Sequence, residues 1–214
     1  CKDLSQKLVN LAMGDYYSIH PVSFSKVLGL VEIFFQDYLS NPPRMEKILR
    51  DLVREMEQAI KKGQKVIDVR EMPKILFTPR FGGWDYAVGD YLYQQGARVV
   101  YADWHLYGFM DRIKTSGDMF ENYADYLLAN SNGFGPNNSA LIDRIANFTV
   151  DNGFEGVIYN QLFGCHSLTT GYTRLRRELL KEEIPSTMVS FNNVGENREQ
   201  LKTRCEALIE IVKA

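Results

Sequence analysis

Cysteine and histidine are scarce in this chain, and their spacing excludes several kinds of site. The 214 residues include three cysteines and three histidines. The cysteines stand at positions 1, 165 and 205, so no pair has the spacing of a zinc finger or of a Cys-x-x-Cys motif. An odd number of distant cysteines also gives no disulfide framework. The sequence therefore excludes a compact zinc domain and a disulfide-stapled secreted scaffold.

Excess positive charge and long apolar runs are missing as well. The net charge is −2, which argues against a nucleic-acid partner because such proteins carry a basic face. No apolar stretch approaches the roughly 20 residues of a membrane helix, and no signal-peptide pattern opens the chain. We therefore expect a cytoplasmic protein with no membrane association. The chain begins at Cys1 rather than at methionine, so we expect it to be part of a longer protein.

Short apolar strands alternate with helical segments in the second part of the chain. The expected strands are 74–78, 98–102, 156–160 and 187–191, and a helical pattern follows each of them. Alternation of this kind predicts a parallel sheet with right-handed crossovers. We predict an α/β domain with a four-stranded parallel sheet, in a flavodoxin-like or Rossmann-like three-layer arrangement.

The first third of the chain has helical periodicity instead. We expect helices over 3–13, 23–34 and 41–62, and we divide the chain into a helical segment, 1–70, and an α/β domain, 71–214. The helical segment would be a linker or part of a missing N-terminal domain.

Three further predictions concern later helices. One runs over about 107–129 with a candidate break at 116–117, one covers 170–183, and the last begins with capping-box spacing between Asn197 and Gln200.

Polar side chains follow each predicted strand. Because parallel strands end at one edge of a sheet, these side chains are expected to converge there, where open α/β sheets bind ligands. The residues chosen on this basis are Arg80, Gly82 and Gly83 after the first strand, Trp104 after the second, Gln161, Cys165 and His166 after the third, and Asn193 after the fourth. Gly82 and Gly83 could expose backbone amides to a phosphate, although a tight turn explains two glycines equally well.

Cys165 stands between a predicted strand and a predicted helix, and three interpretations are open. It could be a metal or cluster ligand, but no second cysteine is nearby in the sequence. It could be a nucleophile, for which His166 is an adjacent but not necessarily facing base. It could also be a small side chain that fills a turn. The start of a helix favours the thiolate form, which suits the first two interpretations. Cys205 falls on an apolar helical face and is expected to be core.

Three runs in the second half of the chain resemble the C-terminal domain of the 2-hydroxyacyl-CoA dehydratase and benzoyl-CoA reductase family. They are DNGFEGVIYN at 151–160 followed by Cys165, LRRELLKEEIP at 175–185, and GENREQLKTRCEA at 195–207. The resemblance is clearest over 139–214 and extends less strongly back to residue 74. Cys1-Lys2-Asp3 weakly resembles a further cysteine segment of the family.

This resemblance implies an iron–sulfur enzyme subunit that acts on an acyl-CoA. Family members hold a [4Fe-4S] or related cluster through three cysteines, of which the loop matching Cys165 supplies one. Cys1 would be a further ligand, and the rest would lie outside this chain. The resemblance also implies a homologous second subunit, an ATP-dependent activator that supplies one electron, and a ketyl-radical route to dehydration or ring reduction. His166 and Gln161 would be catalytic, and Arg80, Gly82, Gly83, Trp104 and Asn193 would bind the cofactor or substrate.

Two other classes of function remain open at the level of the sequence. Many family members have an aspartate after the matching cysteine, where this chain has His166. The chain could therefore be a non-catalytic scaffold or partner subunit of the same fold. It could also be a metal-free small-molecule-binding domain that uses the same edge of the sheet.

Overall fold

A computed structural model describes residues 1–33, 41–64, 66–78, 85–102, 112–130, 138–164, 166–193 and 195–214. Its central element is a parallel sheet of four strands: β3 (Lys74–Thr78), β4 (Arg98–Tyr101), β5 (Gly156–Leu162) and β6 (Ser186–Phe191). The strand order is β4-β3-β5-β6, and each neighbouring pair is parallel. The predicted four-stranded α/β fold is confirmed. If these four strands are numbered along the chain, their order across the sheet is 2-1-3-4, which is that of a flavodoxin-like sheet.

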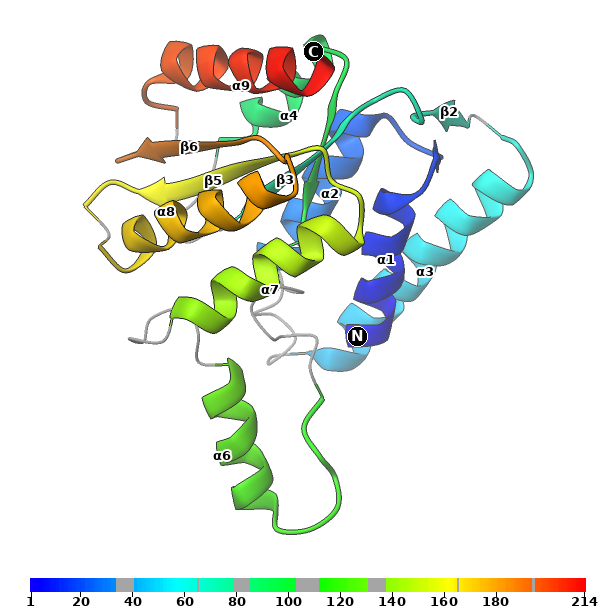
Figure 1. The fold of residues 1–214 in the computed structure, drawn as a ribbon. Coiled ribbons are helices and arrows are strands. Elements are labelled where there is room, and N and C mark those ends of the chain that lie inside the picture. The colour runs from blue at the N-terminus through cyan, green and yellow to red at the C-terminus, as the bar shows by residue number, and fades with distance from the viewer. Residues whose placement is uncertain are drawn as a thin grey trace.

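Helices cover both faces of this sheet (Figure 1). One face carries α4 (Ala87–Gln94) and α9 (Arg198–Lys213), and the other carries α7 (Asn138–Asp151) and α8 (His166–Lys181). The strands β3, β4 and β5 are almost wholly buried because both of their faces are covered, as expected for a parallel sheet. Gly156 lets α9 approach β5, since a Cβ at this position would lie 3.1 Å from Ile75 Cδ1 and 3.2 Å from Val212 Cγ2.

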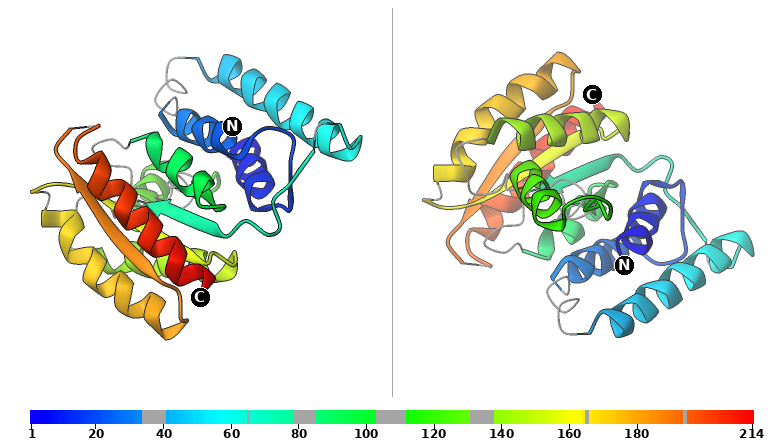
Figure 2. Two further views of the ribbon diagram at one scale, coloured as in Figure 1. Left: turned by 90° about the horizontal axis from the view of Figure 1, so that it is seen from above. Right: turned by 90° about the horizontal axis from the view of Figure 1, so that it is seen from below.

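The N-terminal helices pack beside the β4 edge of the sheet (Figure 2). They are α1 (Lys2–Met13), α2 (Pro21–Ile33) and α3 (Pro42–Lys61), and α2 contacts both β4 and α4. The apolar stripe of α3 buries Met45, Leu49, Val53 and Met56, and Asn41 caps this helix by accepting a hydrogen bond from the Arg44 amide. The buried side chains of the helices and of the sheet form one continuous core.

Buried Arg98 ties the sheet to these helices. Its Nη1 donates to the Gly14 carbonyl oxygen at 2.7 Å and, at 3.5 Å, to that of Ala12. Its guanidinium also lies over the Tyr17 ring, with Cζ 5.2 Å from the ring centroid. The Tyr17 hydroxyl donates to Ala12 O at 2.6 Å, so the end of α1 is held from two sides.

Several element boundaries differ from the predictions. The helix α6 (Met119–Asn130) begins after 112–118, which the prediction had placed in a longer helix. Asp118 accepts hydrogen bonds from the Phe120 and Glu121 amides, and this cap sets the start. The helix α8 begins at His166 rather than at residue 170. A two-residue pair, β1 (Tyr16–Tyr17) with antiparallel β2 (Ile67–Asp68), was not predicted.

The start of α9 also departs from its prediction. Asn197 has the left-handed backbone conformation, with φ +53, and its side chain makes no capping hydrogen bond, so the predicted capping box is wrong. Among the helices of the described ranges, none is long and apolar enough to cross a membrane.

Candidate functional site

The carboxyl ends of β3, β5 and β6 form one edge, and this edge includes the point at which the strand order reverses. The chain leaves β3 toward β4 on one side, whereas β5 and β6 follow on the other. In open α/β sheets such a reversal leaves a crevice between neighbouring strands, and ligands bind there. The candidate site is therefore centred on β3 and β5.

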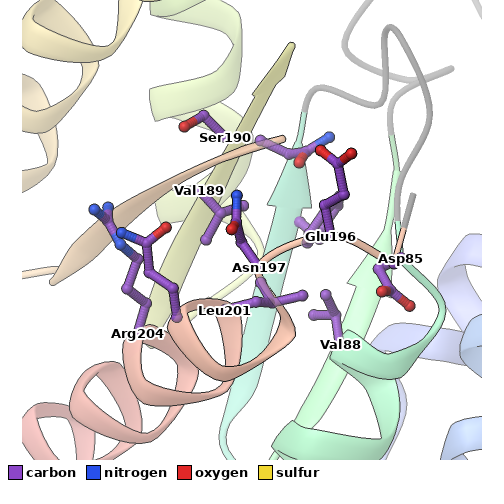
Figure 3. A pocket seen from close by; sticks show the side chains of 12 residues that line it. Asp85, Val88, Val189, Ser190, Glu196, Asn197, Leu201 and Arg204 are labelled. Carbon is purple, nitrogen blue, oxygen red and sulfur yellow. The ribbon is translucent and has the colours of Figure 1, made fainter. Parts of the chain in front are cut away.

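A pocket opens at this edge on the face that carries α4 and α9 (Figure 3). Phe77 of β3, Asn160 of β5 and Val189 of β6 line its floor, and the start of α9 lines its side. The hollow is small: the space in it that water could occupy is about 20 Å³, and the figure rises to about 420 Å³ only when open solvent at its mouth is included. Polar groups from the strands and from a helix start thus converge on one opening, an arrangement typical of a small-molecule site.

Two carboxylates border this pocket, and hydrogen bonds hold each of them. Asp85 accepts from Arg198 Nε at 2.9 Å and from the Ala87 amide at 2.9 Å. The same carboxylate raises the pKa of Arg198 through this hydrogen bond and through its charge. Glu196 accepts from the backbone amide and from Nδ2 of Asn193, at 3.2 and 2.6 Å. These bonds join α4, the loop after β6 and α9 around the opening.

The predicted site residues are only partly among the described residues. Arg80, Gly82, Gly83, Trp104 and Cys165 lie outside them. Gln161 lies on β5 and is buried, with 6% of its surface exposed. His166 is the first residue of α8, and Asn193 lies in the loop that borders the pocket. Cys165 therefore directly precedes a 16-residue helix in the sequence.

Cys1 lies apart from this edge. It is the N-cap residue of α1, and its Sγ is 3.9 Å from the carbonyl oxygen of Pro42 at the start of α3. In the views of Figures 1 and 2 the N-terminus lies by α1 and α3, away from the start of α8. Its thiol is partly exposed.

Cys205 lies on α9, and its side chain is buried in the core, as predicted. Burial raises the pKa of this thiol to about 12, and the nearby charge of Glu206 adds to the effect. A thiol in this state does not supply the thiolate that a cluster or an electrophile needs. In the part of the chain that the structure describes, no group of three or more His, Cys, Asp and Glu side chains is placed to hold a metal ion.

Sequence reasoning missed two features of this edge. The first is the Asp85–Arg198 ion pair, which joins residues 113 positions apart and has no local signal. The second is Thr78, the last residue of β3, whose hydroxyl is fully buried. Its position at the end of a predicted strand could have marked Thr78 as a candidate site residue, but only the structure shows that its hydroxyl has no partner among the described residues.

The fold and the polar carboxyl edge of the sheet define the class of protein, a flavodoxin-like α/β domain with a candidate ligand site at the switch point of its sheet. Comparison with family models then identifies the family. The chain belongs to the family described as 2-hydroxyglutaryl-CoA dehydratase, D-component, whose model matches residues 2–212. The family assignment suggested by the sequence is thereby confirmed, and it makes the chain a subunit of the 2-hydroxyacyl-CoA dehydratase type. No curated protein shows a significant match to the chain.

Members of this family are associated with iron–sulfur cofactors, and the family implies a partner subunit and an activator in general terms. The described residues do not by themselves form a complete cluster site. Cys205 is excluded by its burial, and Cys165 lies outside the described residues. Two buried oxygens without partners among the described residues, Thr78 Oγ1 and Gln161 Oε1, lie at the same strand ends.

Proposed function

We propose that this chain is the cluster-holding subunit of a 2-hydroxyacyl-CoA dehydratase, with Cys165 as a ligand of a [4Fe-4S] or related cluster. The observation that carries the proposal is the start of α8 at His166, at the carboxyl end of β5. A thiol that directly precedes a long helix lies in the positive end of the helix dipole, which stabilises a thiolate. Cys1 and a homologous partner subunit would together supply the other ligands.

The proposed reaction converts a 2-hydroxyacyl-CoA to an enoyl-CoA and water. Dehydration is neutral in electrons, so the one electron from an ATP-dependent activator that makes the ketyl radical must be returned after hydroxide and a β-proton have left. The cluster would supply and take back this electron. Ring reduction, as in a benzoyl-CoA reductase, would instead consume electrons, and measuring electrons used per product separates the two reactions.

The chain's own residues would bind the substrate and move the proton. We assign His166 both proton transfers: an imidazolium nitrogen would deliver a proton to the departing hydroxide, and the neutral imidazole left behind would accept the β-proton, so that the residue ends in the state in which it began. Gln161 would orient the substrate from the floor of the edge. Arg80 and the amides of Gly82 and Gly83 would bind the CoA phosphates, and Trp104 would pack on the adenine. Asn193 would act by holding Glu196 and thus the loop beside the pocket.

The division of the chain is part of the same proposal. Residues 71–214 would be the unit that carries the site, since every proposed site residue except Cys1 belongs to it. Residues 1–70 would support that unit through the packing of α2 on β4 and would present Cys1 toward the remainder of the enzyme.

Anaerobic reconstitution with iron and sulfide tests the ligand assignment. We expect Cys165→Ala to bind much less iron and sulfide than the wild-type chain, whereas Cys205→Ala should load normally because its thiol is in the core. Cys1→Ala measures separately whether the N-terminus contributes a ligand. Wild-type loading in Cys165→Ala would refute the cluster proposal and favour a scaffold subunit of the same fold.

A second candidate function is metal-free binding of a small molecule. The pocket beside α4 and α9 favours it, because this opening is on the opposite face of the sheet from α8 and its carboxylates are already paired. Acyl-CoA binding by the iron-free chain, with an affinity that iron and sulfide do not change and that Asp85→Asn weakens, would support this alternative. Binding that requires the cluster would contradict it.

A further inference from the structure

Two buried polar side chains at the ends of β3 and β5 each have an oxygen without a hydrogen-bond partner among the described residues. Thr78 is fully buried, and Gln161 is 6% exposed. Neither Thr78 Oγ1 nor Gln161 Oε1 has a partner in the described parts of the chain. An unpaired polar atom in the interior costs free energy comparable to a lost hydrogen bond, so its retention calls for an explanation.

These two side chains share one face of the sheet. The Tyr159 ring packs against Tyr172 of α8, with centroids 5.5 Å apart, so Tyr159 faces α8. Gln161 is two residues further along β5 and therefore points to the same face. Thr78 pairs with Tyr159 in the ladder between β3 and β5, which also places it on this face.

The position of this pair matches the topology of the site. Thr78 is the last residue of β3, and Gln161 is the second-last residue of β5. These are the strands between which the strand order reverses, and the chain passes from β5 into α8 on the face that the pair occupies. Both groups therefore lie beside the switch point, on the face of the sheet that also carries α8.

Two other buried hydroxyl groups of the described chain show what a structural role looks like, although Ser18 Oγ, between β1 and α2, also has no partner there. Thr149 Oγ1 donates to Ile145 O at 2.7 Å, and Ser25 Oγ donates to Val22 O at 2.8 Å. Both bonds are to carbonyls of the same helix and need no ligand. The unpaired Nε atoms of Arg98 and Arg174 belong to guanidinium groups that are bonded through another nitrogen.

We propose that Thr78 and Gln161 form a hydrogen-bonding subsite for the 2-hydroxy thioester end of the substrate. In this subsite Gln161 Oε1 accepts a hydrogen bond from the substrate hydroxyl, and the Thr78 hydroxyl donates to the thioester carbonyl oxygen. Both groups are neutral, which suits a hydroxyl and a carbonyl better than a phosphate or carboxylate. The inference rests on the proposed dehydratase function and adds a role for each residue.

The first arm of the test measures the stability of the ligand-free chain. Thr78→Val replaces an unpaired hydroxyl with a methyl group of similar volume, so the urea midpoint should stay unchanged or rise. Thr149→Val is the matched control: it removes an equally buried but bonded hydroxyl, and its midpoint should fall. An equal fall in both variants would show that Thr78 has a structural bond and would overturn the inference.

The second arm measures dissociation constants for 2-hydroxyglutaryl-CoA and for glutaryl-CoA, which lacks the hydroxyl. Gln161→Met should weaken binding of the hydroxylated probe by about tenfold and leave the other probe unchanged. Thr78→Val should weaken both probes to a similar degree, because both carry the thioester carbonyl. Binding of both probes by the two variants as by the wild type, or no preference for the hydroxyl in the wild type, would contradict the subsite.

The two proposals can fail separately in these experiments. Iron and sulfide content decides the role of Cys165 without reference to the probes. Preference for the hydroxylated probe decides the roles of Thr78 and Gln161 at whatever iron content the chain holds. A wild-type chain that loads a cluster but binds neither probe would overturn the subsite alone.

Discussion

Replacing Arg98 with methionine should destabilise the whole chain, because this side chain joins the sheet to the N-terminal helices. Methionine keeps the unbranched apolar stem but removes the bond from Nη1 to Gly14 O and the stacking on Tyr17. A charge-assisted hydrogen bond contributes about 1.5–3 kcal/mol and a desolvated cation–π contact about 1–2 kcal/mol. Relief of the desolvated guanidinium offsets part of this loss. We expect a net loss of about 2–4 kcal/mol in the free energy of unfolding.

Urea unfolding followed by circular dichroism measures this change in free energy. Thermal melting is a second readout: at about 2–4 °C per kcal/mol for a chain of this size, the melting temperature should fall by about 4–16 °C. Arg174→Met is the matched control, since Arg174 pairs with Asp143 while 39% of its side chain is exposed. An exposed pair of this kind contributes about 0–1 kcal/mol. If Arg98→Met lost no more stability than Arg174→Met, the buried contacts of Arg98 would carry no net stabilisation, and the reasoning would be wrong.

Two further predictions concern β5 and the core under α9. Gly156→Val should cost about 1–3 kcal/mol of stability, because its side chain would collide with α9 and β3. Thermal melting tests this, and an unchanged melting temperature would contradict it. Cys205 should resist alkylation in the native chain and react after unfolding, as peptide mass spectrometry can show. Its pKa is about 12 in the folded chain against an ordinary value of 9, so the unfolded state loses this proton first as the pH rises. The free energy of unfolding should therefore fall between pH 9 and 12, and Cys205→Ala should lessen that fall.

The strands of the sheet were predictable because their apolar runs are distinct from the helical pattern around them. The strand at 74–78 was predicted with its observed ends. β5 runs two residues past its predicted end at Asn160, because its ladder with β6 continues through polar Gln161. Hydrophobicity marks only the buried apolar part of a strand, whereas backbone pairing sets its length. The two-residue strands β1 and β2 have no periodicity, and their pairing over about fifty residues left no local signal.

The candidate site was predictable in its location and less so in its chemistry. Strand ends in a parallel sheet converge, so Gln161 and His166 could be chosen from the sequence. The register of β5 decides which face of the sheet Gln161 occupies. Only a full account of the hydrogen bonds among the described residues shows that its Oε1 is unpaired. The predicted cap at Asn197 is wrong because capping also depends on backbone conformation, which the sequence spacing does not reveal. Its sequence spacing is correct, but its backbone is left-handed and turns the side chain away from capping.

The measurement that tests the central claim most directly is dehydration of 2-hydroxyglutaryl-CoA by this chain together with the proposed partner subunit and activator. The account predicts that product forms only with ATP and a reductant, that electrons are not consumed in proportion to product, and that Cys165→Ala abolishes turnover while Cys205→Ala does not. Turnover by Cys165→Ala at the wild-type rate, or dehydration that needs neither ATP nor a reductant, would contradict it.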